Sequence, residues 1–114
     1  MDTVTLPGCP PIAPLGVGTW AWGDRSTWGM GGYDDSLTEA TIAGAWEASL
    51  DAGLALFDTA EIYGKGESER IIGRLLAQDP SRRSSVVLAT KFMPAPHKLD
   101  VRRAMRTALE ASLE

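Results

Sequence analysis

Three residues whose side chains can hold or move a proton lie at the ends of two short apolar runs. Asp58 follows the apolar run at 54–57, and Tyr63 comes five residues after Asp58. Lys91 directly follows the second apolar run, at 86–90. Short apolar runs of this kind are typical of buried strands in α/β proteins, where functional residues gather beyond the carboxyl ends of parallel strands. If the two strands are parallel neighbours, the three side chains meet at one rim of the sheet.

These three residue types together can protonate a carbonyl oxygen during hydride delivery. A phenol has a pKa of about 10, and a neighbouring ammonium favours the phenolate and makes the proton easier to donate. A carboxylate beside the lysine would hold the ammonium in place and keep it charged. We therefore predict Tyr63 as general acid, Lys91 as the group that tunes it and Asp58 as the anchor. Taken singly, each could instead be a capping, packing or snorkelling side chain.

The elements that must position these residues alternate between strand and helix. The sequence predicts strands at 15–19, 54–58 and 86–91, and helices at 37–52, 68–78 and from residue 101 onwards. Such alternation means parallel strands joined by right-handed crossovers. A short hairpin, limited by several prolines, is expected before the first strand. The spacing of Ser36 and Glu39 predicts a capping box at the first helix, and Gly53 is expected to end it.

A long loop rich in tryptophan and glycine follows the first predicted strand. Its aromatic residues are Trp20, Trp22, Trp28 and Tyr33. Long loops without structure of their own are usually functional or mobile, so these rings predict a wall around a ligand. The alternative is that they cap the end of the sheet or barrel.

Residues 16–21 match the dinucleotide fingerprint G-x-G-x-x-G/A, but their context does not fit it. The fingerprint requires a helix directly after the glycines, because the pyrophosphate lies at that helix N-terminus. Here the next residues, 22–24, read Trp-Gly-Asp and do not begin a helix. We therefore do not predict a Rossmann site.

The composition describes one α/β domain or part of one. The chain has 114 residues, 44% of them hydrophobic, and a formal net charge of −4, which gives no reason to expect a nucleic acid partner. Residues 1–69 carry eleven acidic and two basic side chains, whereas residues 70–114 carry four and nine. The basic half is read as a solvated face. The single Cys9, the lack of a signal region and the lack of a long apolar run predict a cytoplasmic protein without a membrane partner.

Several segments resemble one enzyme family. The residues at 57–64, followed by 66–69 and Gly73, are similar to the signature of the aldo-keto reductases. The segments at 15–20 and 89–91 resemble two further family segments in the same order.

The resemblance implies that residues 1–114 form the N-terminal part of a (β/α)8 TIM barrel, with about three βα units after a hairpin that closes the barrel bottom. It implies NADPH as cofactor and reduction of an aldehyde or ketone to an alcohol. Asp58, Tyr63 and Lys91 match three members of the family's catalytic tetrad, while Thr19, Trp20 and Asp58 match positions at the nicotinamide end. No metal site is implied. The Trp-Gly-Asp loop is most like that of bacterial and plastid-type members, so a plastid location is an alternative for a plant homologue.

The resemblance leaves a non-catalytic alternative and one mismatch. Potassium-channel β subunits share the Gly-Thr-Trp and Asp-Thr-Ala-Glu elements, so a nicotinamide-binding regulatory subunit is the alternative function. The fourth catalytic residue of the family is a histidine, and the only histidine here, His97, does not match it. A barrel of this type needs about 250 residues. We therefore expect a truncated domain that is inactive alone and self-associates through bare strand edges.

Overall fold

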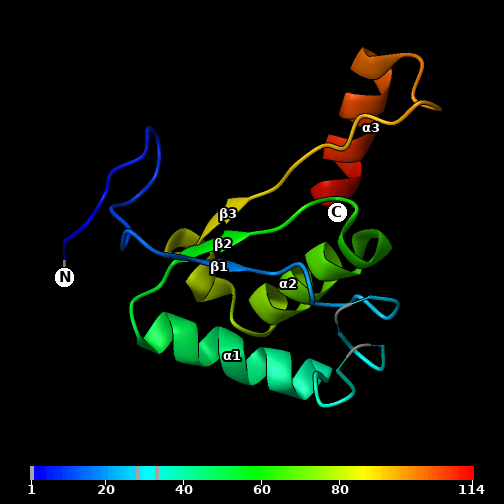
Figure 1. The fold of residues 1–114 in the computed structure, drawn as a ribbon. Coiled ribbons are helices and arrows are strands. Elements are labelled where there is room, and N and C mark those ends of the chain that lie inside the picture. Colours follow the sequence, from blue (N-terminus) through cyan, green and yellow to red (C-terminus); the bar gives the residue numbers. More distant parts are fainter. Residues whose placement is uncertain (1, 28, 33) are drawn as a thin grey trace.

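A three-stranded parallel sheet organises the chain. The structure is a computed structural model that describes residues 2–27, 29–32 and 34–114 (Figure 1). Its strands are β1 (Gly16–Gly18), β2 (Leu56–Asp58) and β3 (Val87–Ala89), in the order β1-β2-β3. The register places Gly18, Asp58 and Ala89 level with one another, so the carboxyl ends of the strands meet at one rim. The predicted parallel order is confirmed, although each strand is shorter than predicted.

The helices are α1 (Glu39–Asp51), α2 (Glu67–Gln78) and α3 (Val101–Ser112), with 3-10 turns at Tyr63–Gly66 and Pro80–Ser84. Helix α1 begins two residues later than predicted, and the capping-box prediction is wrong. Thr38 is the N-cap, and its hydroxyl accepts from the Thr41 amide at 3.2 Å. Ser36 lies before the helix, where both its amide and its hydroxyl donate to the Asp34 carboxylate, at 2.9 and 2.6 Å.

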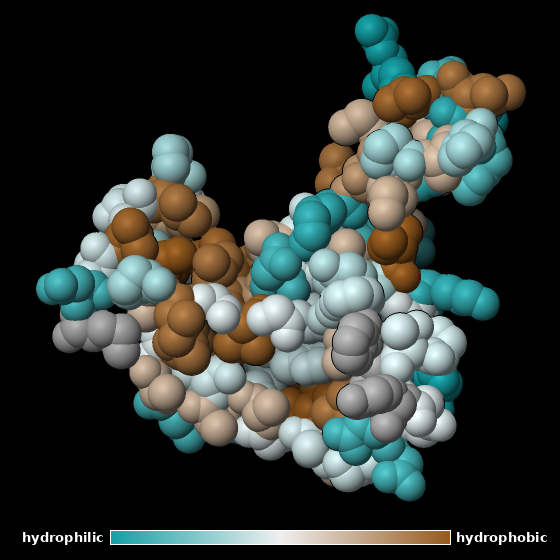
Figure 2. Space-filling view, in the orientation of Figure 1, coloured by the Kyte–Doolittle hydropathy of each residue, from teal (hydrophilic) through white to brown (hydrophobic). Residues whose placement is uncertain are grey.

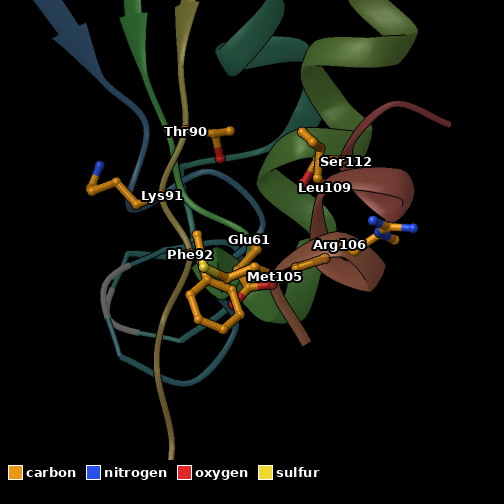
Figure 3. A pocket seen from close by; sticks show the side chains of 9 residues that line it. Glu61, Thr90, Lys91, Phe92, Met105, Arg106, Leu109 and Ser112 are labelled. Atoms are coloured by element: carbon orange, nitrogen blue, oxygen red, sulfur yellow. The ribbon is translucent and has the colours of Figure 1, made fainter. Parts of the chain in front are cut away.

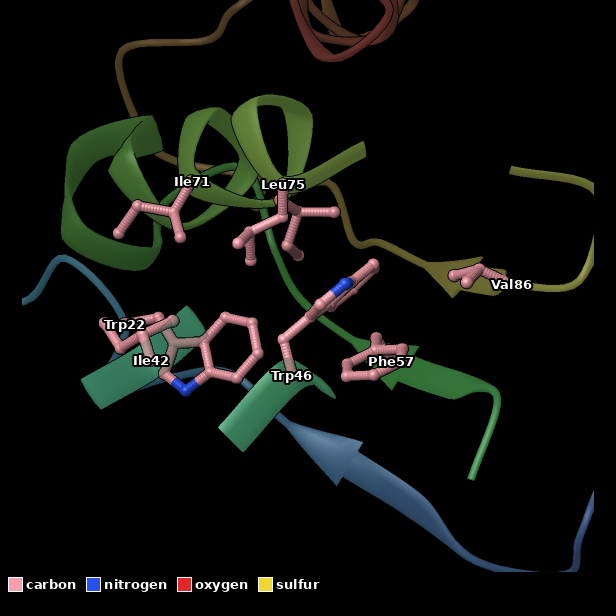
Figure 4. Close-up of a cluster of buried hydrophobic side chains, with 8 residues drawn as sticks. Trp22, Ile42, Trp46, Phe57, Ile71, Leu75 and Val86 are labelled. Carbon is pink, nitrogen blue, oxygen red and sulfur yellow. The ribbon is translucent and has the colours of Figure 1, made fainter. Parts of the chain in front are cut away.

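Helices α1 and α2 cover the same face of the sheet and enclose the main core between them and β2 (Figures 1 and 4). The core consists of the buried residues Trp22, Ile42, Trp46, Phe57, Ile71, Ile72, Leu75 and Val86. The rings of Trp46 and Phe57 lie 4.4 Å apart between their centroids at its centre. Burying large apolar side chains on one face fixes β2, and therefore fixes the direction in which the chain continues beyond Asp58.

The predicted N-terminal hairpin is reduced to one antiparallel bridge. Val4 and Ile12 exchange backbone hydrogen bonds of 2.8 and 2.9 Å. Pro7, Pro10 and Pro11 lie between them and have no amide hydrogen to extend the ladder, which is the limit expected from the sequence.

Helix α3 projects from the body of the molecule (Figure 1), and its apolar stripe is uncovered. The predicted stripe is present, but Val101, Met105 and Leu109 are all about half exposed, and no residue of the helix is buried. Figure 2 shows apolar surface on the projecting arm, apart from the apolar surface over the N-terminal segment and sheet. None of the helices in the described ranges is both long and apolar enough to span a membrane.

Candidate active site

Asp58 and Lys91 form an ion pair at the carboxyl rim of the sheet. Asp58 is the last residue of β2, and Lys91 follows the end of β3 by two residues. The Lys91 Nζ donates to both carboxylate oxygens of Asp58, at 2.8 and 2.9 Å, and to the carbonyl of Thr59 at 2.8 Å. Both side chains are 50% exposed. The prediction that they lie at the same end of adjacent parallel strands is confirmed.

Tyr63 lies against this ion pair, as the sequence predicts. The Lys91 Nζ is 5.2 Å from the centroid of the Tyr63 ring. The Asp58 carboxylate accepts hydrogen bonds from Lys91, and this raises the pKa of Lys91 above its ordinary value of 10.5. Partial desolvation opposes this rise, and the Tyr63 hydroxyl adds to it. The rim therefore carries a fixed positive charge at neutral pH, beside a phenol.

A tight left-handed turn aims Tyr63 at the rim. Gly64, Lys65 and Gly66 all have positive φ, at 57°, 56° and 91°, directly before helix α2. A Cβ on Gly64 would lie 2.6 Å from the carbonyl oxygen of Gly23. Only glycine permits this close approach of the two backbones without a shift. The turn thus packs the Tyr63 segment against the loop that follows β1.

The aromatic residues of that loop divide between the site and the core. Trp20 is 54% exposed, and its ring stacks on Tyr63 with the centroids 6.3 Å apart. Trp22 is buried against Phe57, so its predicted place in a ligand-facing wall is wrong. The other two rings assigned to that wall, Trp28 and Tyr33, lie outside the described residues.

Thr19 supports the site from behind and has no surface toward a ligand. The residue is fully buried, and its hydroxyl donates to the Asp58 carbonyl at 3.0 Å. Its predicted contact with the nicotinamide end is therefore not available in this structure, because its polar group is already engaged inside the fold. Ser68 and Thr59 complete the same buried cluster of hydroxyls. Sequence reasoning missed both, although Thr59 directly follows a strand and Ser68 lies in the first turn of a helix.

A second lysine–carboxylate pair, Glu61 with Lys98, lies close to the first and was also missed. Glu61 Oε1 accepts from Lys98 Nζ at 2.8 Å and from the Met93 amide at 2.9 Å. Burial raises the Glu61 pKa, but the hydrogen bonds and charge of Lys98 and the Met93 amide outweigh it, and the pKa lies below its ordinary value of 4.5. This pair fastens the segment between β3 and α3 to the loop that carries Tyr63.

The remaining candidates are a histidine and a cavity. His97 is exposed on the segment between β3 and α3, as predicted. A cavity of about 360 Å³ lies between that segment and α3, and its mostly apolar lining includes Phe92, Met105 and Leu109. Figure 3 shows the Lys91 ammonium directed away from this cavity. Within the described part of the chain, no cluster of three or more His, Cys, Asp or Glu side chains is arranged to hold a metal.

Comparison with known proteins decides the family. The sequence model of the aldo/keto reductase family matches residues 14–114, which is most of the chain. The chain belongs to the aldo/keto reductase family. Family members fold as (β/α)8 barrels, and the parallel strands and helices described above form an open part of such a barrel.

Individual aldo/keto reductases are similar to this chain over most of its length. It is 38% identical over 96 residues to the chloroplastic pyridoxal reductase of Arabidopsis thaliana, covering 77% of this chain and 25% of that protein. A glycerol dehydrogenase structure from Gluconobacter oxydans has 36% identity and a TM-score of 0.68, covering 98% of this chain and 35% of that one. An aldo-keto reductase structure from Klebsiella pneumoniae in complex with NADPH has 27% identity and a TM-score of 0.60, covering 90% and 32%.

The chain thus spans about a quarter of the length of the curated aldo/keto reductases that it matches. Structures of the family bind NADPH or NADP. Two of the three residues expected at the nicotinamide end fit such a ligand here, because Trp20 and the Asp58 carboxylate are both exposed at the rim. Thr19 does not fit as a direct contact because it is fully buried.

Proposed function

We propose that this chain supplies the proton-donating part of an NADPH-dependent enzyme that reduces an aldehyde or ketone to an alcohol. The observation that carries the proposal is the position of Lys91, whose ammonium binds the Asp58 carboxylate and lies 5.2 Å from the centre of the Tyr63 ring. A positive charge beside a phenol stabilises the phenolate that remains after the proton has left. The family membership of the chain supports the same reaction class.

Tyr63 is the general acid in this proposal. NADPH, when bound, supplies the hydride that adds to the carbonyl carbon. The Tyr63 hydroxyl gives its proton to the carbonyl oxygen as negative charge develops there. Lys91 stays charged throughout because Asp58 holds it, so it needs no rearrangement when the phenolate forms. Trp20 and Asp58 are the residues of this chain that would contact the nicotinamide end.

The substrate class follows from the same chemistry and from the relatives. A proton donor at an open rim suits a small carbonyl compound. A similar protein is named as a reductase of pyridoxal, which is an aldehyde, and a similar structure is a dehydrogenase of glycerol, which is an alcohol. These are the two directions of one interconversion. We therefore assign small aldehydes or ketones as the class of substrate.

The direct test is NADPH oxidation in the presence of a small aldehyde, measured on the longest polypeptide that carries this sequence. Tyr63→Phe is the matched variant, because it removes one hydroxyl and leaves the ring against Trp20. General acid catalysis commonly contributes about 10²–10⁴-fold, and we expect a loss of that size. Binding of NADPH without turnover in the parent would favour the regulatory alternative. Turnover unaffected by Tyr63→Phe would contradict the assigned role.

The 114-residue chain by itself is expected to show little or no turnover. Its single histidine, His97, is exposed on the segment after β3, so the chain offers no histidine at the rim to orient the carbonyl. Removing one such polarising donor commonly costs about a hundredfold or more in rate. The same assay on the purified chain measures this. Robust reduction of an aldehyde by the chain alone would contradict the prediction.

A further inference from the structure

Three hydroxyl side chains form a dry cluster directly behind the Asp58–Lys91 pair. Thr19, Thr59 and Ser68 come from the ends of β1 and β2 and from the first turn of α2, and all three are buried. The Ser68 Oγ lies 2.8 Å from the Thr19 Oγ1 and 3.0 Å from the Thr59 Oγ1. Buried hydroxyls retain their partners because an unsatisfied one costs free energy. The cluster therefore has a defined pattern of donors.

The three hydroxyls can donate to one another in one consistent direction. Thr19 donates to the Asp58 carbonyl at 3.0 Å, so the Thr19 oxygen is left as an acceptor for Ser68. Ser68 in turn accepts from Thr59, whose proton has no other described acceptor. Ser68 also lies 3.1 Å from the Thr19 carbonyl, which is an alternative acceptor for its proton. The chain thus runs from Thr59 to Ser68 and then to Thr19, either at its carbonyl or at its hydroxyl, and the Thr19 hydroxyl donates to the Asp58 carbonyl.

The hydroxyl cluster and the Lys91 ammonium both contact Asp58 and Thr59, through different atoms. On the dry side, the Asp58 carbonyl accepts from both the amide and the hydroxyl of Thr19, each at 3.0 Å, and the Thr59 amide donates to Ala89 at 2.7 Å. On the open side, the Asp58 carboxylate and the Thr59 carbonyl accept from Lys91. Asp58 and Thr59 together carry all three acceptors of the ammonium, so a shift of the backbone at these two residues would move the acceptors.

We propose that Thr19, Thr59 and Ser68 are positioning residues, whose linked hydroxyls fix the Asp58–Thr59 peptide and thereby hold Lys91 in place beside Tyr63. Their functional meaning rests on the function proposed above, in which Lys91 acts on Tyr63. A purely structural role is the competing explanation, since the hydroxyls also join α2 to the sheet. The two explanations differ in what happens to Lys91 when a hydroxyl is removed from a chain that still folds.

The experiment measures the pKa of Lys91 by NMR in protein with ¹³C-labelled lysine side chains, using the same polypeptide as the turnover assay. The Lys91 signal is identified by its absence from Lys91→Met. Thr19→Val removes the hydroxyl and keeps the shape of the side chain, whereas Thr19→Ser keeps the hydroxyl and is the matched control. Ser68→Ala removes the central hydroxyl. Asp58→Asn removes the carboxylate charge and gives the change in the Lys91 pKa that complete loss of this partner causes. The measurement of the Lys91 pKa requires neither NADPH nor a carbonyl compound, so its result does not depend on whether the protein turns over a substrate.

We expect Lys91 to titrate at a lower pH in Thr19→Val and Ser68→Ala than in the parent, which is the direction of the shift in Asp58→Asn. Thr19→Ser should keep the parent value. A folded Thr19→Val protein with the parent pKa at Lys91 would overturn the proposal. If Thr19→Val does not fold, Ser68→Ala and Thr59→Val decide by the same criterion. Loss of folding in all three, with Thr19→Ser folded, would also overturn it, because the hydroxyls would then serve the fold alone.

Discussion

Two lysines that follow β3 each form an ion pair with a carboxylate at or just after the end of β2. The two ion pairs have the same length but differ in their exposure to solvent. Lys91 lies 2.8 Å from Asp58, and Lys98 lies 2.8 Å from Glu61. The side chains of the first pair are each 50% exposed, whereas those of the second are only 20% and 17% exposed. The second lysine also lies 4.3 Å from the centroid of the Phe92 ring.

The difference shows that distance alone does not give an ion pair its role. An exposed pair gains little net free energy, because water screens it and competes for its hydrogen bonds. A covered pair leaves an uncompensated charge when one partner is removed, so breaking it is costly. We infer that the Glu61–Lys98 pair serves mainly to fasten the segment after β3. The Asp58–Lys91 pair contributes little to stability and is open to a ligand beside Tyr63.

The largest expected effect separates the two lysines by turnover. Lys91→Met should lower NADPH-dependent reduction of an aldehyde by about a hundredfold or more, because the charge that stabilises the phenolate is lost. Lys98→Met is the matched control and should keep most of the parent turnover. Steady-state kinetics on the longest polypeptide that carries the sequence measures both. Equal losses in the two variants would mean that the two ion pairs do not differ in function.

The two lysine substitutions should have the opposite order of effect on the free energy of unfolding. Lys98→Met leaves the poorly exposed Glu61 carboxylate without its cation and should cost about 1–3 kcal/mol of unfolding free energy. Lys91→Met breaks an exposed pair and should cost about 0–1 kcal/mol. Denaturant unfolding of both proteins gives the comparison. A larger cost for Lys91→Met would mean that the rim pair, not the covered pair, holds the two loops together.

A smaller effect is a difference in pH dependence. The Lys91 pKa is raised in the folded chain, so its contribution is complete below about 10.5 and disappears as the pH rises through the folded value. The Glu61 pKa is lowered, so its contribution is present above about 4.5 and disappears as the pH falls through the folded value. The melting temperature should therefore fall less on acidification in Glu61→Gln than in the parent. It should fall less at alkaline pH in Lys91→Met than in the parent. Identical profiles in parent and variants would contradict both assignments.

The sequence predicts those parts of the site that depend on strand ends. Asp58 and Lys91 could be located because a short apolar run followed by a polar residue marks the carboxyl end of a strand. The covered pair could not be found, because Glu61 and Lys98 are 37 residues apart and neither lies on a periodic element. Thr19 is expected at the nicotinamide end because it matches a family position there, next to Trp20, but in the structure Thr19 is buried and Trp20 is exposed. Nothing in the sequence shows that the two side chains point in opposite directions.

The fold was predictable in its order and less so in its boundaries and surfaces. Alternating apolar and helical patterns give the parallel sheet, but the start of α1 depends on which of two nearby polar side chains takes a backbone amide. Thr38 accepts the Thr41 amide and caps the helix, whereas Ser36 donates to Asp34 before the helix begins. Trp22 is expected in the wall of a site because it is one of four aromatic residues in a single loop, and a glycine-rich loop gives no periodicity from which to judge burial. Its burial is decided by Phe57, far away in sequence.

The uncovered stripe of α3 has a consequence for any measurement of stability. Val101, Met105 and Leu109 of α3 are exposed, as is Leu113 directly after the helix, and apolar surface of this kind favours association. We expect the isolated chain to cover it with further copies of itself. Stability then follows mass action: a state that gains from a partner unfolds at a temperature that rises with protein concentration. Thermal scans over a dilution series, paired with sedimentation, measure this. A monomer with the same midpoint at every concentration would mean that the chain closes its apolar face alone.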